Sequence, residues 1–210
     1  MKAEQMDAAL IHAHKRKLRQ EMLSWRRSIP ARVREGWSRT IVQHVLSSMP
    51  YAKAHTIFAY ASMPGEVELD ELLMAVLADQ KVLCIPDLTA ENGEMRATRL
   101  HRLEDLVIGR FDIRSLPPDR LDVVPPAAID IVFVPGAAFS PDGSRLGLGG
   151  GYYDRFLRNT GALRVACTFD GQIVDAVPME AFDQCVDVIL TEKRTIDCRK
   201  IRKESVLHGD

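Results

Sequence analysis

The sequence predicts an α/β protein: a three-layer sandwich with a mostly parallel sheet, helices on both faces and an N-terminal pair of helices. From residue 56 onward, apolar stretches that suit strands alternate with stretches that suit helices, which is the order of a parallel sheet. Before residue 56, apolar residues recur at helical spacing in two successive segments. The chain has 210 residues, and we expect them to form a single domain over 1–210.

The expected elements follow in chain order. The N-terminal helices are predicted at 15–27, which is strongly basic, and at 32–48. Residues 1–11 resemble a loosely ordered lead-in and residues 193–210 a polar tail, so both are expected to be peripheral. A third helix is predicted at 69–78 and a fourth from Tyr152, while 103–126, which is rich in proline, is expected to hold only short elements. Strands are predicted at 56–61, 81–86, 95–100, 129–134, 164–168 and 186–192.

Composition excludes several classes of protein. The hydrophobic content of 46% supports a sizeable core, and the formal charge of −1 argues against a nucleic-acid binder that uses its whole surface. No apolar run reaches the ~18 residues of a membrane span. The four cysteines form no C-x-x-C pair, and no export signal precedes them, so we expect reduced thiols and a cytoplasmic location.

The most informative segment is 145–154, Arg-Leu-Gly-Leu-Gly-Gly-Gly-Tyr-Tyr-Asp, which follows a predicted strand and leads into a predicted helix. A loop in which glycines remove most Cβ atoms approaches a ligand closely, and its consecutive N–H groups bind anions. Arg145 is a planar donor suited to phosphate, and Asp154, in the first helical turn, suits a hard cation. These are the parts of a magnesium–nucleotide site.

Residue types alone leave two interpretations of this segment open, a phosphate-binding loop and a flexible loop beside a solvated arginine. The segment lacks the Gly-Lys-Ser/Thr end of a P-loop. Gly147 and Gly149 supply only the first half of a dinucleotide fingerprint, and they lie deep in the chain rather than after a first strand.

A longer pattern favours the first interpretation. It consists of Pro-Gly-Ala-Ala-Phe at 135–139 and Gly-Ser-Arg-Leu-Gly-Leu-Gly-Gly-Gly-Tyr-Tyr-Asp-Arg-Phe-Leu at 143–157, together with Lys15-x-x-Leu-Arg19 near the N-terminus. This pattern resembles the signature of the 5-formyltetrahydrofolate cyclo-ligase family, also called methenyltetrahydrofolate synthetase. The resemblance covers nearly the whole chain, densely at 135–157, and implies a three-layer α/β fold.

The resemblance also implies a set of site residues. Catalytic roles are implied for Arg145 and Tyr152, and ligation of magnesium for Asp154 and Asp187. Contacts with ATP are implied for Lys15, Arg19, Arg145, Leu146, Gly147, Leu148, Gly149, Gly150, Gly151, Tyr152 and Tyr153. Contacts with the folate are implied for Ala61, Met63, Glu66, Gly149, Gly150 and Tyr152.

Two of these carboxylates also have an ordinary structural explanation. Asp187 lies in an apolar strand and needs a partner, because burying an unpaired carboxylate is costly, and a local hydrogen bond would satisfy it. Glu66 precedes the helix predicted at 69–78, where an acidic side chain suits the helix dipole.

The implied reaction is closure of 5-formyltetrahydrofolate to 5,10-methenyltetrahydrofolate, with ATP as co-substrate, Mg²⁺ as cofactor, and ADP and phosphate as products. The expected partners are this folate and ATP, with no membrane and no nucleic acid, and we expect a monomer. Two alternatives remain open: a non-catalytic relative that binds nucleotide or folate, and an RNA-associated protein that acts through its basic N-terminal helix.

Overall fold

The structure is a computed structural model that describes residues 2–88, 93–109 and 112–208. Within these residues eight strands form one sheet in the order β12-β11-β10-β7-β1-β2-β3-β6. The five strands from β11 to β2 pair in parallel, and the remaining three pair antiparallel at the two edges. The prediction of a mostly parallel sheet is therefore confirmed. The strands of the sheet are β1 (Thr56–Phe58), β2 (Val82–Asp87), β3 (Arg96–Leu100), β6 (Val123–Val124), β7 (Ile131–Phe133), β10 (Leu163–Cys167), β11 (Val188–Leu190) and β12 (Thr195–Asp197).

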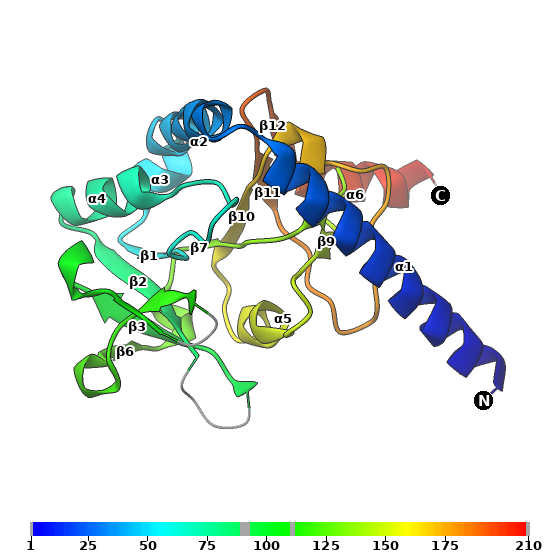
Figure 1. The fold of residues 1–210 in the computed structure, drawn as a ribbon, viewed down its shortest axis with the longest axis horizontal. Coiled ribbons are helices and arrows are strands. Elements are labelled where there is room, and N and C mark those ends of the chain that lie inside the picture. The colour runs from blue at the N-terminus through cyan, green and yellow to red at the C-terminus, as the bar shows by residue number, and fades with distance from the viewer. Residues whose placement is uncertain (1, 89–92, 110–111, 209–210) are drawn as a thin grey trace.

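Successive residues of the central strands point to opposite faces of the sheet, so each strand serves two apolar clusters. On β7, for example, Ile131 and Phe133 belong to one cluster and Val132 to the other. The first cluster is covered by α2 (Ala31–Leu46), α3 (Met49–Lys53) and α4 (Asp70–Ala78). The second is covered by α5 (Tyr152–Leu157) and α6 (Cys198–His208). Figure 1 shows α2, α3 and α4 on one side of the sheet and α5 on the other, so the expected three layers are present.

The first helix, α1 (Lys2–Ser28), packs outside these layers and extends past the body of the protein (Figure 1). Its apolar face rests on the hairpin of β8 (Ala138–Phe139) and β9 (Arg145–Leu146), and the contacts include Leu18, Met22 and Leu23 of the helix. The predicted pair of N-terminal helices is thus confirmed. The proline-rich connector holds only short elements, as expected: η2 (Leu103–Asp105), β4 (Val107–Ile108), β5 (Arg114–Ser115), η4 (Pro118–Arg120) and η5 (Pro126–Ala128).

Both chain ends differ from the sequence-based expectation. Residues 2–11 do not form a loose lead-in, because α1 already begins at Lys2. This stretch contains three alanines and one each of lysine, glutamate, glutamine, methionine and leucine, which favour helix without producing a clear apolar period. The expected polar tail was also wrong: β12 pairs with β11, and Ile196 and Cys198 are buried. A three-residue strand with one apolar residue is too short to show alternation in the sequence.

Asp130 is the one polar residue in the apolar run at 129–134. Its side chain binds the backbone at the start of β1. Its Oδ2 accepts hydrogen bonds from the N–H groups of His55 and Thr56, at 2.7 and 2.9 Å. The hydrogen bond from Thr56 is the main cause that lowers the pKa of Asp130 below its ordinary value. A carboxylate whose pKa is lowered by folding stabilises the fold above its unfolded pKa, and this stabilisation is lost as the pH falls.

We expect Asp130→Ala to lower the free energy of unfolding by about 1 kcal/mol at neutral pH, because two N–H groups lose a charged acceptor that is exposed and therefore screened. Urea unfolding of wild type and variant measures the difference, which should shrink as the pH is lowered below ~4. Asp119→Ala is the matched control, since Asp119 is exposed and makes no hydrogen bond within the described residues. An Asp130→Ala effect that stays constant with pH would contradict the assignment.

Candidate active site

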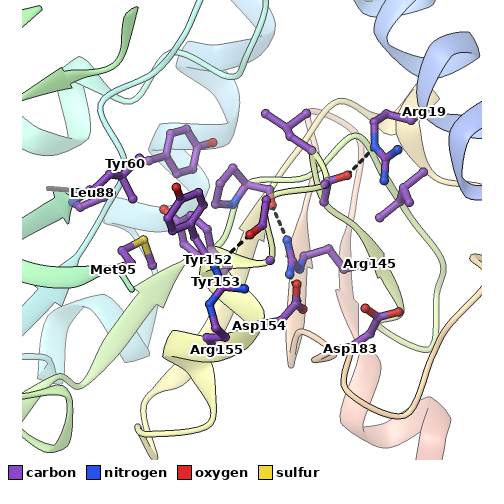
Figure 2. A pocket seen from close by; sticks show the side chains of 18 of the residues that line it. Arg19, Tyr60, Leu88, Met95, Arg145, Tyr152, Tyr153, Asp154, Arg155 and Asp183 are labelled. Atoms are coloured by element: carbon purple, nitrogen blue, oxygen red, sulfur yellow. Dashed lines mark hydrogen bonds and ion pairs between the residues drawn. The ribbon is translucent and has the colours of Figure 1, made fainter. Parts of the chain in front are cut away.

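A cavity of about 830 Å³ lies at the C-terminal ends of the parallel strands, where open α/β sheets bind their ligands (Figure 2). β1 ends at Phe58 rather than at the predicted residue 61, so residues 60 and 61 leave the strand and line this cavity. The other walls come from α1, the hairpin of β8 and β9, the glycine loop, α5 and the segment 180–183. With the exception of Asp187, every residue that the sequence predicted for the site lines this one cavity.

The glycine loop runs from β9 to α5 along one wall of the cavity. Gly149 has φ +105° and Gly151 has φ +66°, and L side chains rarely adopt either conformation. Gly151 is the N-cap of α5, and its left-handed conformation turns the loop into the helix. Within the described part of the chain, the N–H groups of residues 148–151 donate no hydrogen bond to protein. The loop therefore offers unpaired donors at the cavity wall.

Arg145 lies beneath this loop with 5% of its surface exposed. Its Nη2 donates to Oδ1 of Asp154 at 2.6 Å, and its Nη1 donates to the carbonyl oxygen of Pro135 at 3.2 Å (Figure 2). Its Nε is buried and has no partner among the described residues. A Cβ added to Gly147 would lie 2.9 Å from Nη1 of Arg145, so the absent side chain makes room for the guanidinium. Arg145 thus lines the cavity and has one N–H group that no described residue accepts.

Two cations of α1 reach the same wall. Arg19 Nε donates to the carbonyl oxygen of Gly147 at 2.9 Å, and burial lowers the pKa of Arg19. Lys15 Nζ donates to Glu180 at 2.7 Å and also to Asp183. Burial lowers the pKa of Lys15, but the hydrogen bonds and charges of Asp183 and Glu180 outweigh it and raise the pKa above its ordinary value. Lys15 is therefore a firmly protonated cation at the cavity.

Of the two predicted metal ligands, only one lines the cavity. Asp154 lines the cavity, whereas Asp187 does not. The Oδ2 of Asp187 accepts from the backbone N–H of Arg164 at 3.0 Å, and its Oδ1 accepts from Nη2 of Arg202 at 3.4 Å. Asp187 thus joins α6 to the sheet. These local hydrogen bonds are the ordinary structural explanation for Asp187 that the sequence analysis allowed.

A different carboxylate, Asp183, shares the cavity with Asp154 (Figure 2). The next residue connects them, because the backbone N–H of Gln184 donates to Oδ1 of Asp154 at 3.0 Å. Within the described residues, no group of three or more His, Cys, Asp or Glu side chains is placed to hold a metal ion. A cation here would need oxygen atoms from a ligand as well as from these two residues.

The opposite end of the cavity is aromatic. Tyr60, Tyr152 and Tyr153 come together there beside Leu88 and Met95 (Figure 2). The hydroxyl of Tyr153 is buried without a partner among the described residues, and burial raises its pKa. This end suits a flat, partly polar ring system, because aromatic side chains stack on such rings and the hydroxyl provides a polar contact.

Glu66 adds one acidic group to the aromatic end. Its side chain is 5% exposed, and its Oε2 accepts from the backbone N–H of Met63 at 3.1 Å. Its Oε1 lies 3.9 Å from Nη1 of Arg26 on α1. Burial raises the pKa of Glu66, while the charge of Arg26 and the hydrogen bond from Met63 act in the opposite direction. Of the two explanations for Glu66, placement in the cavity is the one that the fold favours.

Sequence reasoning missed several residues that line the cavity. Glu180 and Asp183 lie in an irregular segment, where no apolar period indicates the direction of a side chain. Arg155 lies within the recognised motif at 143–157 but was assigned no role, and its Nη2 donates to the carbonyl oxygens of Gly93 and Gly150 at 2.6 and 2.9 Å. Pro135 belongs to the recognised element at 135–139, and Ile113 to a segment that resembles the family only weakly, so neither was assigned a role. No sequence pattern distinguished the remaining members, which are His12, Tyr60, Pro86, Leu88, Met95, Arg158 and Phe182.

Comparison with known proteins agrees with this geometry. Residues 11–192 match the 5-formyltetrahydrofolate cyclo-ligase family. The chain belongs to this family. The resemblance predicted from the sequence is therefore confirmed, and membership makes the chain an enzyme of the cyclo-ligase class.

Relatives from distant organisms match over most of their length. The chain is 31% identical to the 5-formyltetrahydrofolate cyclo-ligase of Mycolicibacterium smegmatis, over 87% of this chain and 95% of that protein. It is 28% identical to the enzyme of that name from Mus musculus, over 89% and 98%. Among solved structures, Aquifex aeolicus 5,10-methenyltetrahydrofolate synthetase superposes with a TM-score of 0.79 and 32% identity, over 88% of this chain and 93% of that one.

No helix in the described residues is long and apolar enough to span a membrane.

Proposed function

We propose that the chain closes 5-formyltetrahydrofolate to 5,10-methenyltetrahydrofolate with ATP as co-substrate, and releases ADP and phosphate. The observation that carries this proposal is that one cavity has two unlike ends. One end combines free backbone N–H groups with cations, and the other combines aromatic rings with a buried carboxylate. The names of the relatives give the folate reaction, and the two ends suit a polyphosphate and a pterin ring respectively.

The cationic end suits the phosphate chain of ATP. We propose that the glycine loop, with Leu146, Leu148 and Tyr153 beside it, holds the β- and γ-phosphates through its N–H groups. Lys15, Arg19 and Arg145 would offset the negative charge, each through charge-assisted hydrogen bonds worth about 1.5–3 kcal/mol. Phosphoryl transfer depends chiefly on such positioning and charge neutralisation.

The aromatic end suits the folate. We propose that Ala61, Met63 and Glu66 contact the pterin together with Tyr152, whose ring lies at this end of the cavity (Figure 2). The order of bond changes then follows from chemistry. The formyl oxygen on N5 attacks the γ-phosphorus, the bond from phosphorus to the β-phosphate oxygen breaks, and ADP leaves. N10 attacks the formyl carbon, the C–O bond to phosphate breaks, and N10 loses its proton to solvent.

ATP is needed because the formyl group is an amide-like, weak electrophile whose oxygen is a poor leaving group. Phosphorylation converts that oxygen into phosphate, which departs readily. In this scheme Arg145 and Tyr152 are the catalytic residues. The guanidinium of Arg145 neutralises charge on the transferred phosphoryl group, and the ring of Tyr152 holds the pterin so that its formyl oxygen is in line with the γ-phosphorus.

Magnesium fits the donor set of this chain in part. Asp154 accepts both of its hydrogen bonds through Oδ1, so its Oδ2 is available among the described residues, and Asp183 lies in the same cavity. Magnesium commonly takes one or two carboxylates and completes its shell with water and substrate phosphates. We propose Asp154 and Asp183 as the residues that would hold it. When bound, it would neutralise charge on the phosphates.

The test is a coupled assay with purified protein, 5-formyltetrahydrofolate and Mg-ATP. We expect the near-ultraviolet absorbance of the methenyl product to rise in step with ADP, in a ratio of one to one. ADP without methenyl product would indicate an unrelated ATPase. Binding of ATP with neither product would indicate a non-catalytic relative, and either result would refute the proposal.

A further inference from the structure

Behind Glu66, outside the cavity lining, lies a buried cation with no assigned role. Arg26 is 7% exposed, and its Nη1 is 3.9 Å from Oε1 of Glu66. It does not itself line the cavity, whereas Glu66 does. Arginine is rarely buried to this degree unless it is paired. Its partner here is therefore the carboxylate of the aromatic end.

Arg26 stands on the same helix as the cations of the opposite end. Lys15, Arg19 and Arg26 are spaced by four and seven residues, which places them on one face of α1. Eleven residues of helix span about 16 Å, so this face extends from the cationic end of the cavity to the aromatic end. The last turn of α1 thus reaches the carboxylate that we assign to the folate.

The charge of Arg26 helps to keep the buried Glu66 carboxylate ionised. A carboxylate that is 5% exposed beside tyrosine rings loses most of its hydration, and desolvation favours the neutral acid. The titratable groups that interact with Glu66 come from three elements: Arg26 of α1, whose charge lowers the pKa of Glu66, and Tyr60 after β1 and Tyr153 of α5, whose pKa values the charge of Glu66 raises. Arg26 is the only cation among them, and the hydrogen bond from Met63 is the other interaction that favours the charged form.

The length of the ion pair leaves Glu66 free to bind a ligand. At 3.9 Å the pair is not a hydrogen bond, so Arg26 supplies charge without occupying the lone pairs of Oε1. Oε2 is fixed by the N–H of Met63. An anionic carboxylate in this state is an acceptor for two neighbouring N–H donors, such as those on one edge of a pterin ring.

We infer that Arg26 is a positioning residue, which holds the Glu66 carboxylate in place as an anionic acceptor for ring N–H donors of the folate. This inference rests on the proposed function, because it concerns how the same cavity binds its folate. It predicts that removing the cation weakens the binding of folate and leaves the binding of nucleotide almost unchanged.

The experiment measures binding rather than turnover. Calorimetric titration gives the dissociation constants of 5-formyltetrahydrofolate and, separately, of a non-hydrolysable ATP analogue, at mildly acidic, neutral and mildly alkaline pH. For Arg26→Met we expect folate affinity to fall on the order of tenfold at neutral pH, the effect of losing one charge-assisted hydrogen bond. The loss should shrink at alkaline pH, where Glu66 ionises without help. Arg26→Lys should retain most of the affinity.

Controls keep the result interpretable. Arg27→Met removes an exposed arginine from the same helical turn and should change neither affinity. The double variant Arg26→Met with Glu66→Gln should bind folate no more weakly than Glu66→Gln alone, because Arg26 then has no carboxylate to act on. This comparison also serves if Arg26→Met alone proves unstable, since the double variant buries no unpaired charge.

Three results would overturn the inference: unchanged folate affinity in Arg26→Met, a loss that is the same at every pH, or an equal loss for the ATP analogue. The last two would show a merely structural role. If the wild type bound no folate, the proposed function would fail instead. Carbon-13 NMR titration of Glu66 still tests Arg26 in that case, because the pKa of Glu66 should rise in Arg26→Met but not in Arg27→Met.

Discussion

Arg145→Lys is expected to lower kcat/KM for ATP by about 100-fold, which corresponds to about 2.7 kcal/mol of transition-state stabilisation. Arg145 holds Asp154 with Nη2 and Pro135 with Nη1, and its buried Nε has no partner among the described residues. Lysine restores a charge but not a planar fork of donors, so it cannot hold Asp154 and a phosphoryl oxygen together. Initial rates at varied ATP concentration give the effect.

A measurement of stability shows whether the lower activity of Arg145→Lys comes from the site or from unfolding of the variant. We expect Arg145→Lys to cost only about 1–2 kcal/mol in urea unfolding, because lysine still pairs with Asp154. Arg199→Lys makes the same substitution on an exposed arginine of α6 and should leave both activity and stability unchanged. Equal activity of Arg145→Lys and the wild type would remove Arg145 from the phosphate-binding role.

Gly149→Ala is expected to lower kcat/KM by about 10- to 100-fold, because alanine at φ +105° costs about 1–3 kcal/mol and the loop relieves that strain by changing its shape. Space is not the obstacle. A Cβ at this position would lie 3.8 Å from the guanidinium carbon of Arg19, which is an ordinary contact. The fall in kcat/KM should therefore come from a changed orientation of the loop N–H groups. The affinity for the non-hydrolysable ATP analogue should fall as well as the rate of the reaction.

The chain contains a matched control for this substitution. Gly161 lies in the exposed loop before β10, has no positive φ, and would place a new Cβ with nothing within 4 Å. Gly161→Ala should thus leave activity and nucleotide affinity unchanged. If Gly149→Ala were as active as Gly161→Ala, the loop conformation would not be needed for ATP, and the assignment of the phosphate site would have to be abandoned.

The cationic end of the site was predictable because its parts are close in sequence. Arg145, the glycines and Asp154 occupy ten consecutive residues between a strand and a helix, so local conformation alone places them together. Lys15 and Arg19 were predictable as a pair, since residues four apart share a helical face. Their arrival beside the loop is a matter of packing, in which Leu18 and Met22 bring α1 onto the hairpin of β8 and β9.

Asp183, an acidic residue of the cavity that the sequence did not single out, shows the limit of sequence reasoning. Asp187 and Asp183 lie four residues apart, and an apolar strand surrounds only the first, which made it conspicuous. The fold uses Asp187 to bind Arg164 and Arg202, and turns Asp183 toward Lys15. An irregular segment has no period from which the direction of a side chain can be inferred.

The sequence by itself determined the alternation of strands and helices as far as β11, the two-faced core and the glycine loop, because each depends on residues near one another in the chain. Only the tertiary structure decided which distant groups meet. The pairing of Arg26 with Glu66 and of Lys15 with Asp183 joins residues 40 and 168 positions apart. Such contacts depend on how α1 packs on the hairpin of β8 and β9. That packing results from many weak apolar contacts between distant residues, which no local sequence pattern predicts.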